Sequence, residues 1–259
     1  MAAAPIRQAK PLVLEHGGHS LRDAAAAQTF AQEVETFLTA VQGTESVKLF
    51  NCIEGYRDVA LQLRQKAAAM APGRPLMVAL AGVPGSGKST LAAVFERLLA
   101  PACCIVPMDG YHVPLAGLRQ RPDAAEAEYR RGAPDTFDAA AFQAALKEIR
   151  DGPDQVGLPG FDREAGDPTA PGDIFFDRKR HSIVLAEGLY LLHDSDGWEG
   201  TADLFDVRIH LQADLDECIE RVKERNKVIP GYTPEEIDIR CERVDRVNGI
   251  TVETAACRA

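Results

Sequence analysis

The sequence predicts an α/β fold, a doubly wound parallel sheet covered by helices on both faces. Four short apolar segments have the length and composition of buried strands: residues 76–81, 103–106, 183–186 and 207–211. Segments with helical spacing of apolar residues separate most of these strands along the chain. Continuous apolar strands alternating with helices are typical of a parallel sheet buried on both sides.

Composition narrows the class of protein. The 259 residues are enough for one large α/β domain and an appendage, and no apolar run approaches the ~18 residues of a membrane span. The net charge of −10 argues against a nucleic-acid backbone as the main partner. The six cysteines form no CxxC pair, which favours a reduced, cytoplasmic location over the weaker alternative of organelle targeting. The oligomeric state stays open, with a homodimer among the alternatives.

A glycine-rich turn joins the first predicted strand to a helix at 90–99. The turn consists of Gly82, Val83, Pro84, Gly85, Ser86, Gly87, Lys88, Ser89 and Thr90. In this context the backbone N–H groups face a nucleoside triphosphate, Lys88 reaches its β- and γ-phosphates, and the Ser89 hydroxyl binds Mg²⁺. The alternative is a glycine-rich turn without a ligand, which the flanking strand and helix disfavour.

Two acidic residues follow other predicted strands. Ligands of open α/β sheets bind beyond the carboxyl ends of the strands, where both acids would lie. Asp109 could accept the proton of an attacking hydroxyl, or it could belong to a simple Asp-Gly turn, and position alone does not separate the two. Glu187 ends an otherwise apolar strand, which favours a role in holding Mg²⁺ or its water over a solvated strand end.

Arg221 and Arg225 are four residues apart on a predicted helix and therefore share a face. Such a pair could close over a transferring phosphoryl group, or it could be a solvated face balanced by Glu220 and Glu224. The helix begins at a predicted capping box of Asp214 and Glu217. Two further helices are predicted to begin at caps on Asp138 and at Thr233–Glu236.

Three segments divide the chain. We expect an irregular arm over 1–22, a helical hairpin over 23–72 and the main domain over 73–259. The hairpin is predicted from apolar residues at helical spacing over 30–41 and 49–63. A structural cover is its favoured role.

Together these segments resemble the phosphoribulokinase/uridine kinase family of P-loop kinases, in its pantothenate-kinase-like and nucleoside-kinase-like branch. The motifs that carry the resemblance are GVPGSGKST at 82–90, PMDGYH at 107–112, RGAPDTFD at 131–138, PGFDR at 159–163, LAEGLYLL at 185–192, and Trp198 followed by Leu204-Phe205-Asp206. The resemblance covers roughly residues 55–255.

The resemblance implies ATP-dependent phosphorylation of a hydroxyl on a small metabolite that is pantothenate-, nucleoside- or sugar-like. It implies a sheet ordered 2-3-1-4-5, an arginine-bearing lid and Asp109 as the base. It also implies that Tyr111, His112, Asp162 and Arg163 surround the acceptor, and it leaves open which lid arginine faces the phosphates. The alternative function is a nucleotide-dependent switch or scaffold, which would need no acceptor base.

Overall fold

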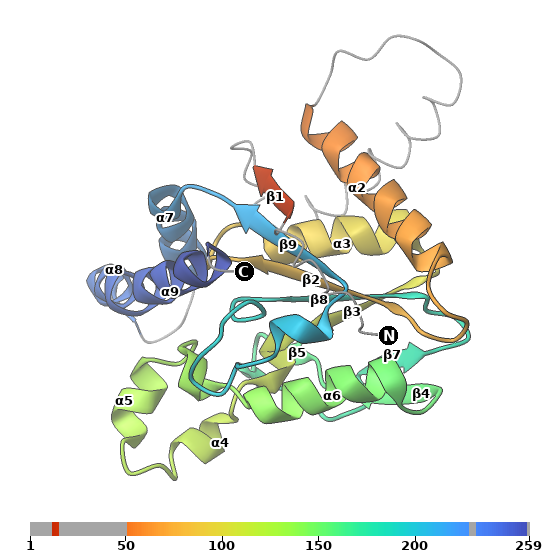
Figure 1. The fold of residues 1–259 in the computed structure, drawn as a ribbon. Helices are drawn as coiled ribbons and strands as arrows, with labels where there is room; N and C mark the ends of the chain where they lie inside the picture. The colour runs from red at the N-terminus through yellow and green to blue at the C-terminus, as the bar shows by residue number, and fades with distance from the viewer. Residues whose placement is uncertain (1–11, 16–50, 228–231, 258–259) are drawn as a thin grey trace, which may run out of the picture.

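The computed structural model describes residues 12–15, 51–227 and 232–257, and it centres on a five-stranded sheet (Figure 1). The strand order is β1-β9-β2-β8-β3, and every neighbouring pair is parallel. The bounds are β1 Leu12–Glu15, β9 Val207–Gln212, β2 Leu76–Gly82, β8 Ile183–Gly188 and β3 Cys103–Pro107. The sheet confirms all four strands that the apolar segments predict.

Helices cover both faces of the sheet (Figure 1). Alternate residues of β2 point to opposite faces, so Leu80 packs with Phe95 while Ala79 joins the core around Phe142. One face is covered by α2 (Asn51–Ala68) and α3 (Lys88–Leu99), and the other by α6 (Ala139–Asp151). Every residue of β2 and β8 is buried, which explains their continuous apolar sequences.

One edge of the sheet corrects the prediction. The predicted order 2-3-1-4-5 needs a fifth strand after β9, but in the described chain only helices follow it. Residues 12–15, predicted as part of an irregular arm, form β1 and pair with β9 at that edge. The run Leu12-Val13-Leu14 is too short to predict a strand from sequence, and the exposed edge of β9 supplies its partner.

The predicted N-terminal hairpin is described in part. Its second helix is confirmed as α2, whereas the helix expected at 30–41 lies outside the described residues. The hairpin and the division into 1–22, 23–72 and 73–259 therefore stay predictions. No helix in the described ranges is long and apolar enough to cross a membrane.

The C-terminal helices are α7 (Leu215–Asn226), α8 (Pro234–Arg240), the π-helical segment η5 (Cys241–Asp245) and α9 (Arg246–Ala256). The predicted capping box of α8 is confirmed in both directions between Thr233 and Glu236. The box of α7 is half formed, because Asp214 accepts the N–H of Glu217 while the Glu217 carboxylate bonds Arg221. The cap of α6 by Asp138 is confirmed.

Short elements fill the chain between β3 and β9. Their bounds are η2 Met108–Tyr111, α4 Leu115–Leu118, α5 Ala124–Tyr129, η3 Pro134–Thr136, β4 Gln155–Leu158, β5 Phe161–Asp162, β6 Asp167–Pro168, β7 Ile174–Asp177 and η4 Ala202–Leu204. Two small antiparallel pairs, β4–β7 and β5–β6, stand beside the main sheet. In Figure 1, α4, α5 and the C-terminal helices lie on the side toward which β2 and β9 point.

Candidate active site

The turn between β2 and α3 has the geometry of a phosphate cradle. Gly85 and Gly87 have φ values of +78° and +90°, which residues with side chains rarely adopt. Gly87 is the N-cap of α3, and no side chain of the described residues caps that helix. Its first N–H groups are therefore left for a ligand, at the positive end of the helix dipole.

The cradle also packs tightly against α7. A Cβ atom at Gly85 would lie 2.2 Å from the carbonyl oxygen of Cys218, so only glycine allows this approach. Ser86 is fully buried, and its Oγ has no hydrogen-bond partner among the described residues. The close contact with α7 brings the two arginines of that helix to the cradle.

Glu187 flanks the cradle from the adjacent strand. It pairs in register with Leu80 of β2 and Pro107 of β3, at the carboxyl edge of the sheet. The Ser89 hydroxyl lies 3.2 and 3.3 Å from its two carboxylate oxygens. Burial raises the pKa of Glu187, and the charge of Lys88 opposes that rise. Burial lowers the pKa of Lys88, which Glu187 opposes in turn, so the two charges compensate each other.

Asp109 lies in η2, directly after β3, with its side chain 40% exposed. Its negative charge opposes the lowering of the Lys88 pKa by burial and adds to the rise of the Glu187 pKa, so its carboxylate is within electrostatic reach of the cradle. His112 Nδ1 lies 2.9 Å from the Asp109 carbonyl oxygen. A carbonyl only accepts, so Nδ1 carries the proton, and Nε2 of the neutral ring is left as an acceptor. Burial lowers the pKa of His112, which favours the neutral ring.

The loop at 159–163 packs directly on the turn that carries Asp109. A Cβ atom at Gly110 would lie 2.4 Å from the Pro159 carbonyl oxygen. Phe161 follows in the same loop, and its ring centroid is 5.1 Å from that of His112. The structure thus brings two of the predicted acceptor motifs, PMDGYH and PGFDR, into contact.

Asp162 and Arg163 differ in how they are held. An oxygen of Asp162 accepts the backbone N–H groups of Glu164 and Ala165 at 2.8 and 3.0 Å, which closes a tight turn. The Arg163 side chain is exposed, and its positive charge opposes the raised pKa of Glu187. Asp162 is therefore engaged in its own loop, whereas Arg163 is within electrostatic reach of the cradle.

Tyr111, which the resemblance places around the acceptor, is buried in the core. Its ring packs edge to face on Phe142, with centroids 5.1 Å apart. Its hydroxyl is buried and has no hydrogen-bond partner in the described chain. Burial raises the pKa of the phenol, so the group stays neutral. The neighbouring His112, by contrast, has its ring near Phe161 of the 159–163 loop.

The two arginines of α7 are placed differently. Arg221 pairs with Glu217 at 3.0 Å and lies 3.5 Å from the Gly85 carbonyl oxygen. Arg225 is exposed, makes no hydrogen bond or ion pair with the described residues, and lowers the pKa of Lys88 through its charge. The acids expected to balance these arginines bond lysines instead: Glu220 pairs with Lys223 and Glu224 with Lys227.

A partly buried ion pair that sequence reasoning misses joins the acceptor loops. Arg131 donates to Asp167 at 2.6 Å, to the Val113 carbonyl at 3.2 Å and to the Gly166 carbonyl. Asp167 also accepts the N–H of Leu115 at 3.0 Å. Arg131 opens the RGAPDTFD motif, which signals its region but not its role. Asp167 has no sequence signal, because only the β5–β6 pairing brings it to this place.

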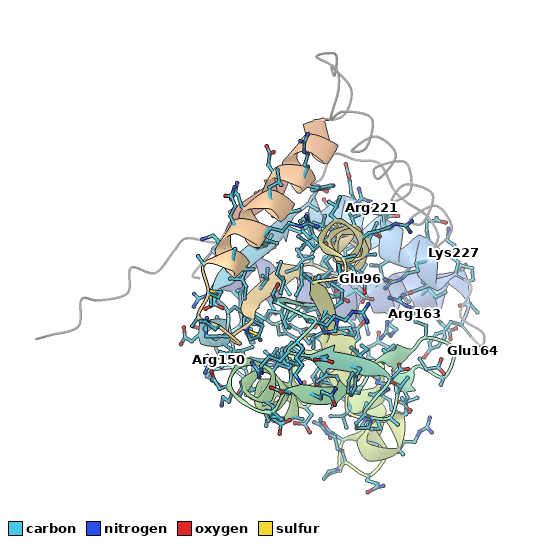
Figure 2. The ribbon with its side chains drawn as sticks, turned by 90° about the vertical axis from the view of Figure 1, so that its right-hand side faces the viewer. Glu96, Arg150, Arg163, Glu164, Arg221 and Lys227 are labelled. Atoms are coloured by element: carbon cyan, nitrogen blue, oxygen red, sulfur yellow. The ribbon has the colours of Figure 1, made fainter. Side chains whose placement is uncertain are left out.

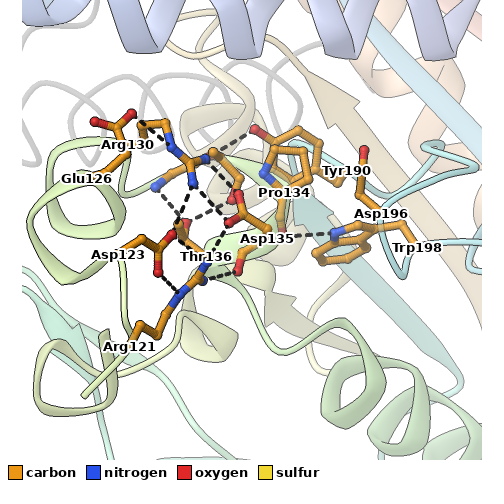
Figure 3. A network of polar contacts seen from close by, with 12 residues as sticks. Arg121, Asp123, Glu126, Arg130, Pro134, Asp135, Thr136, Tyr190, Asp196 and Trp198 are labelled. Carbon is orange, nitrogen blue, oxygen red and sulfur yellow. Dashed lines mark hydrogen bonds and ion pairs between the residues drawn. The ribbon is translucent and has the colours of Figure 1, made fainter. Parts of the chain in front are cut away.

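The rest of the RGAPDTFD segment is anchored by polar contacts (Figure 3). Asp135 pairs with Arg130 at 2.8 Å and with Arg121 at 3.1 Å. The Trp198 indole N–H donates to the Pro134 carbonyl at 3.3 Å. These contacts fix the segment between α5 and α6, so Arg131 extends from a rigid support.

Comparison with known proteins shows which proteins this chain is similar to. Residues 78–245 match the model of the AAA domain family. A protein of Schizosaccharomyces pombe, described as a candidate uridine kinase, is 34% identical over 69% of this chain and 78% of its own length. The pantothenate kinase of Bacillus subtilis is 25% identical over 76% of this chain and 63% of its own. The crystal structure of a candidate fructose transport system kinase of Silicibacter superposes with a TM-score of 0.67, at 27% identity, over 77% of this chain and 94% of that one.

The fold and the cradle define an α/β protein of the P-loop NTPase class. Within that class, the chain belongs to the P-loop kinases of the uridine kinase and pantothenate kinase-like branch. The family expected from the sequence motifs is confirmed.

Proposed function

We propose that this protein transfers the γ-phosphate of ATP to a hydroxyl of a small metabolite, with Asp109 as the general base. The observation that carries the proposal is the place of Asp109. It is a partly exposed carboxylate at the end of the strand beside Glu187, within electrostatic reach of Lys88. A carboxylate next to the γ-phosphate site is what an attacking hydroxyl needs.

The nucleotide half of the site uses the cradle at 82–90. Its N–H groups bind the phosphates, and Lys88 neutralises charge on the β- and γ-phosphates. The Ser89 hydroxyl and the Glu187 carboxylate, 3.2 Å apart, are oxygen donors of the kind that Mg²⁺ prefers. The described residues contain no group of three or more His, Cys, Asp or Glu side chains that could hold a metal. Mg²⁺ held by these two residues would take its other ligands from phosphate and water, and it would offset charge on the transferring group.

The acceptor half is built on η2 and the 159–163 loop. The Asp109 carboxylate takes the proton of the acceptor hydroxyl as that oxygen bonds to the γ-phosphorus. The bond from that phosphorus to the β-phosphate bridging oxygen breaks, and ADP leaves. His112, with its Nε2 free to accept, and the ring of Phe161 offer contacts to the acceptor. Asp162 would stabilise the 159–163 loop, and Tyr111 would anchor η2 in the core.

The lid is assigned to α7. Of its two arginines, Arg225 is the better candidate to contact the transferred phosphate, because Arg221 is paired with Glu217. A preorganised guanidinium stabilises the charge that spreads over the phosphoryl oxygens. The acceptor is drawn from pantothenate-, nucleoside- or sugar-like alcohols.

The alternative is a nucleotide-dependent switch or scaffold. One panel separates the two: ATP turnover with pantothenate, uridine, fructose and ribulose 5-phosphate, with products identified by mass spectrometry. We expect one compound to stimulate turnover and to gain a phosphate. Asp109→Asn should lower transfer ~10²–10⁴-fold and leave ATP binding unchanged, because it removes basicity and preserves shape.

Asp203→Asn is the matched control, because Asp203 is an exposed acid paired with Arg208 away from the cradle. It should keep wild-type transfer. ATP binding without any stimulated product, or full transfer by the Asp109→Asn variant, would favour the switch.

A further inference from the structure

Arg163 stands out among the arginines of the acceptor side. Arg131 is engaged with Asp167, whereas Arg163 makes no hydrogen bond or ion pair with any described residue. No ion pair joins it to its neighbour Glu164, which Figure 2 labels on the same flank of the molecule. The other acid of the loop, Asp162, accepts the backbone N–H of Glu164 and so closes its own turn. A guanidinium in this position is available for a ligand.

The loop that carries Arg163 is held on both sides. Pro159 packs on Gly110, with 2.4 Å between its carbonyl oxygen and an added Cβ. The Gly160 N–H donates to Thr169 Oγ1 at 2.7 Å, and that hydroxyl donates to Asp173 at 2.9 Å. The backbone beneath Arg163 is therefore fixed relative to η2, and its long side chain extends from a rigid base.

The loop places the charge of Arg163 beside the candidate site. Pro159 of this loop packs on Gly110, the residue after Asp109, and the positive charge of Arg163 opposes the raised pKa of Glu187, as that of Lys88 does. The nucleotide already has Lys88, the first turn of α3 and Arg225 as positive partners.

A neutral acceptor would gain no charged contact from this guanidinium, which is exposed and unpaired with the described residues. A carboxylate or a phosphate would match its planar donors with two parallel hydrogen bonds. Resting on the proposed function, we propose that the acceptor alcohol carries an anionic group, a carboxylate or a phosphate, and that Arg163 binds this group and determines specificity for it.

The test compares matched pairs of alcohols that differ in one anionic group: pantothenate with pantothenyl alcohol, ribulose 5-phosphate with ribulose, and glycerate with glycerol. A broader mixture of phosphorylated, carboxylated and neutral alcohols, read by mass spectrometry, accompanies the pairs. We expect transfer to an anionic compound with kcat/KM at least ~10-fold above that of its neutral partner, because charged hydrogen bonds are the stronger ones. The pair in which the anionic compound is preferred shows whether Arg163 binds a carboxylate or a phosphate.

Arg163→Gln should raise KM for the anionic acceptor ~10–100-fold, leave KM for ATP within about twofold, and remove the discrimination within the pair. Arg163→Lys should restore part of it, because the charge returns without the planar fork. Arg180→Gln is the control, since Arg180 is exposed and precedes the amino end of β8, at the opposite edge of the sheet from Glu187.

Equal use of a neutral acceptor would overturn the inference while the kinase proposal stands. A rise in KM for ATP instead of the acceptor would reassign Arg163 to the nucleotide and also overturn it. ATP binding without a phosphorylated product from any class would overturn the kinase proposal, and this inference with it.

Discussion

Replacing Gly110 by Ala tests whether contact between the two acceptor segments sets the chemistry. The new Cβ would lie 2.4 Å from the Pro159 carbonyl oxygen and 3.0 Å from its carbonyl carbon. Favourable contacts between such atoms lie near ~3.5 Å, so one backbone must move by about 1 Å. A misplacement of ~1 Å in a catalytic arrangement can cost ~10²-fold in rate. We expect that loss in acceptor transfer, with about 1–3 kcal/mol of stability lost to overpacking.

Single-turnover transfer to the acceptor identified by the panel measures the rate, and calorimetry with a non-hydrolysable ATP analogue measures nucleotide binding. Binding should be unchanged, because the cradle at 82–90 does not touch this contact. Gly55→Ala is the matched control, since an added Cβ meets nothing within 4 Å in α2. It should raise stability by ~0.5–1 kcal/mol and leave transfer intact. Wild-type transfer by the Gly110→Ala variant would show that the 159–163 loop does not position Asp109.

Three further predictions concern single side chains. Lys88→Ala should abolish detectable transfer, because it removes ~3–4 kcal/mol of transition-state stabilisation. The circular dichroism spectrum should stay that of the native fold. Full activity of this variant would refute the ATP site. Arg225→Ala should lower kcat ~10²-fold with little change in KM for ATP, and Arg221→Ala should lower kcat by a smaller factor. If both variants kept wild-type kcat, α7 would have no part in the mechanism. Hydrogen bonds from Arg246, the largest cause, and from Lys223 lower the pKa of Glu242 to about 2. Because the folded pKa is the lower one, its stabilisation is present above about pH 4.5 and lost as pH falls toward 2. Exposure limits it to ~1 kcal/mol, so the urea midpoint of Glu242→Gln should lie below that of the wild type at pH 6, and the difference should be smaller at pH 3. An equal difference at both pH values would contradict this role of Glu242.

The sequence predicts the centre of this molecule better than its edge. Strands β2 and β8 are buried on both faces, so their residues are apolar throughout and easy to recognise. The cradle at 82–90 is equally easy to recognise, because two of its glycines are needed for positive φ values, which are a local requirement of the backbone. The strand at 12–15 is different, since its pairing with β9 depends on an edge that becomes available only in the folded sheet.

The candidate site shows the same division between local and long-range causes. The positions of Asp109 and Glu187 at one edge of the sheet could be predicted because strand ends converge in a parallel sheet, whereas their roles stay predictions. The pairing of Arg131 with Asp167, at 2.6 Å, depends on loops 36 residues apart, and neither residue stands out by type or spacing. Tyr111 adjoins Asp109 and was expected at the acceptor, yet its ring packs in the core on Phe142. Position along a motif does not fix which way a side chain points in a short helix such as η2.

The pairing of β1 with β9 has a consequence for synthesis on the ribosome. Leu12 pairs with Ile209, so β1 has its partner almost 200 residues downstream. Chains emerge at ~5–20 residues per second, so β1 would wait for seconds or tens of seconds before its partner appears. Meanwhile β2, β3 and β8 emerge in turn and can assemble without it. Because such non-local pairings are slow to form, the edge at β1 should be the last part of the sheet to close as the nascent chain folds.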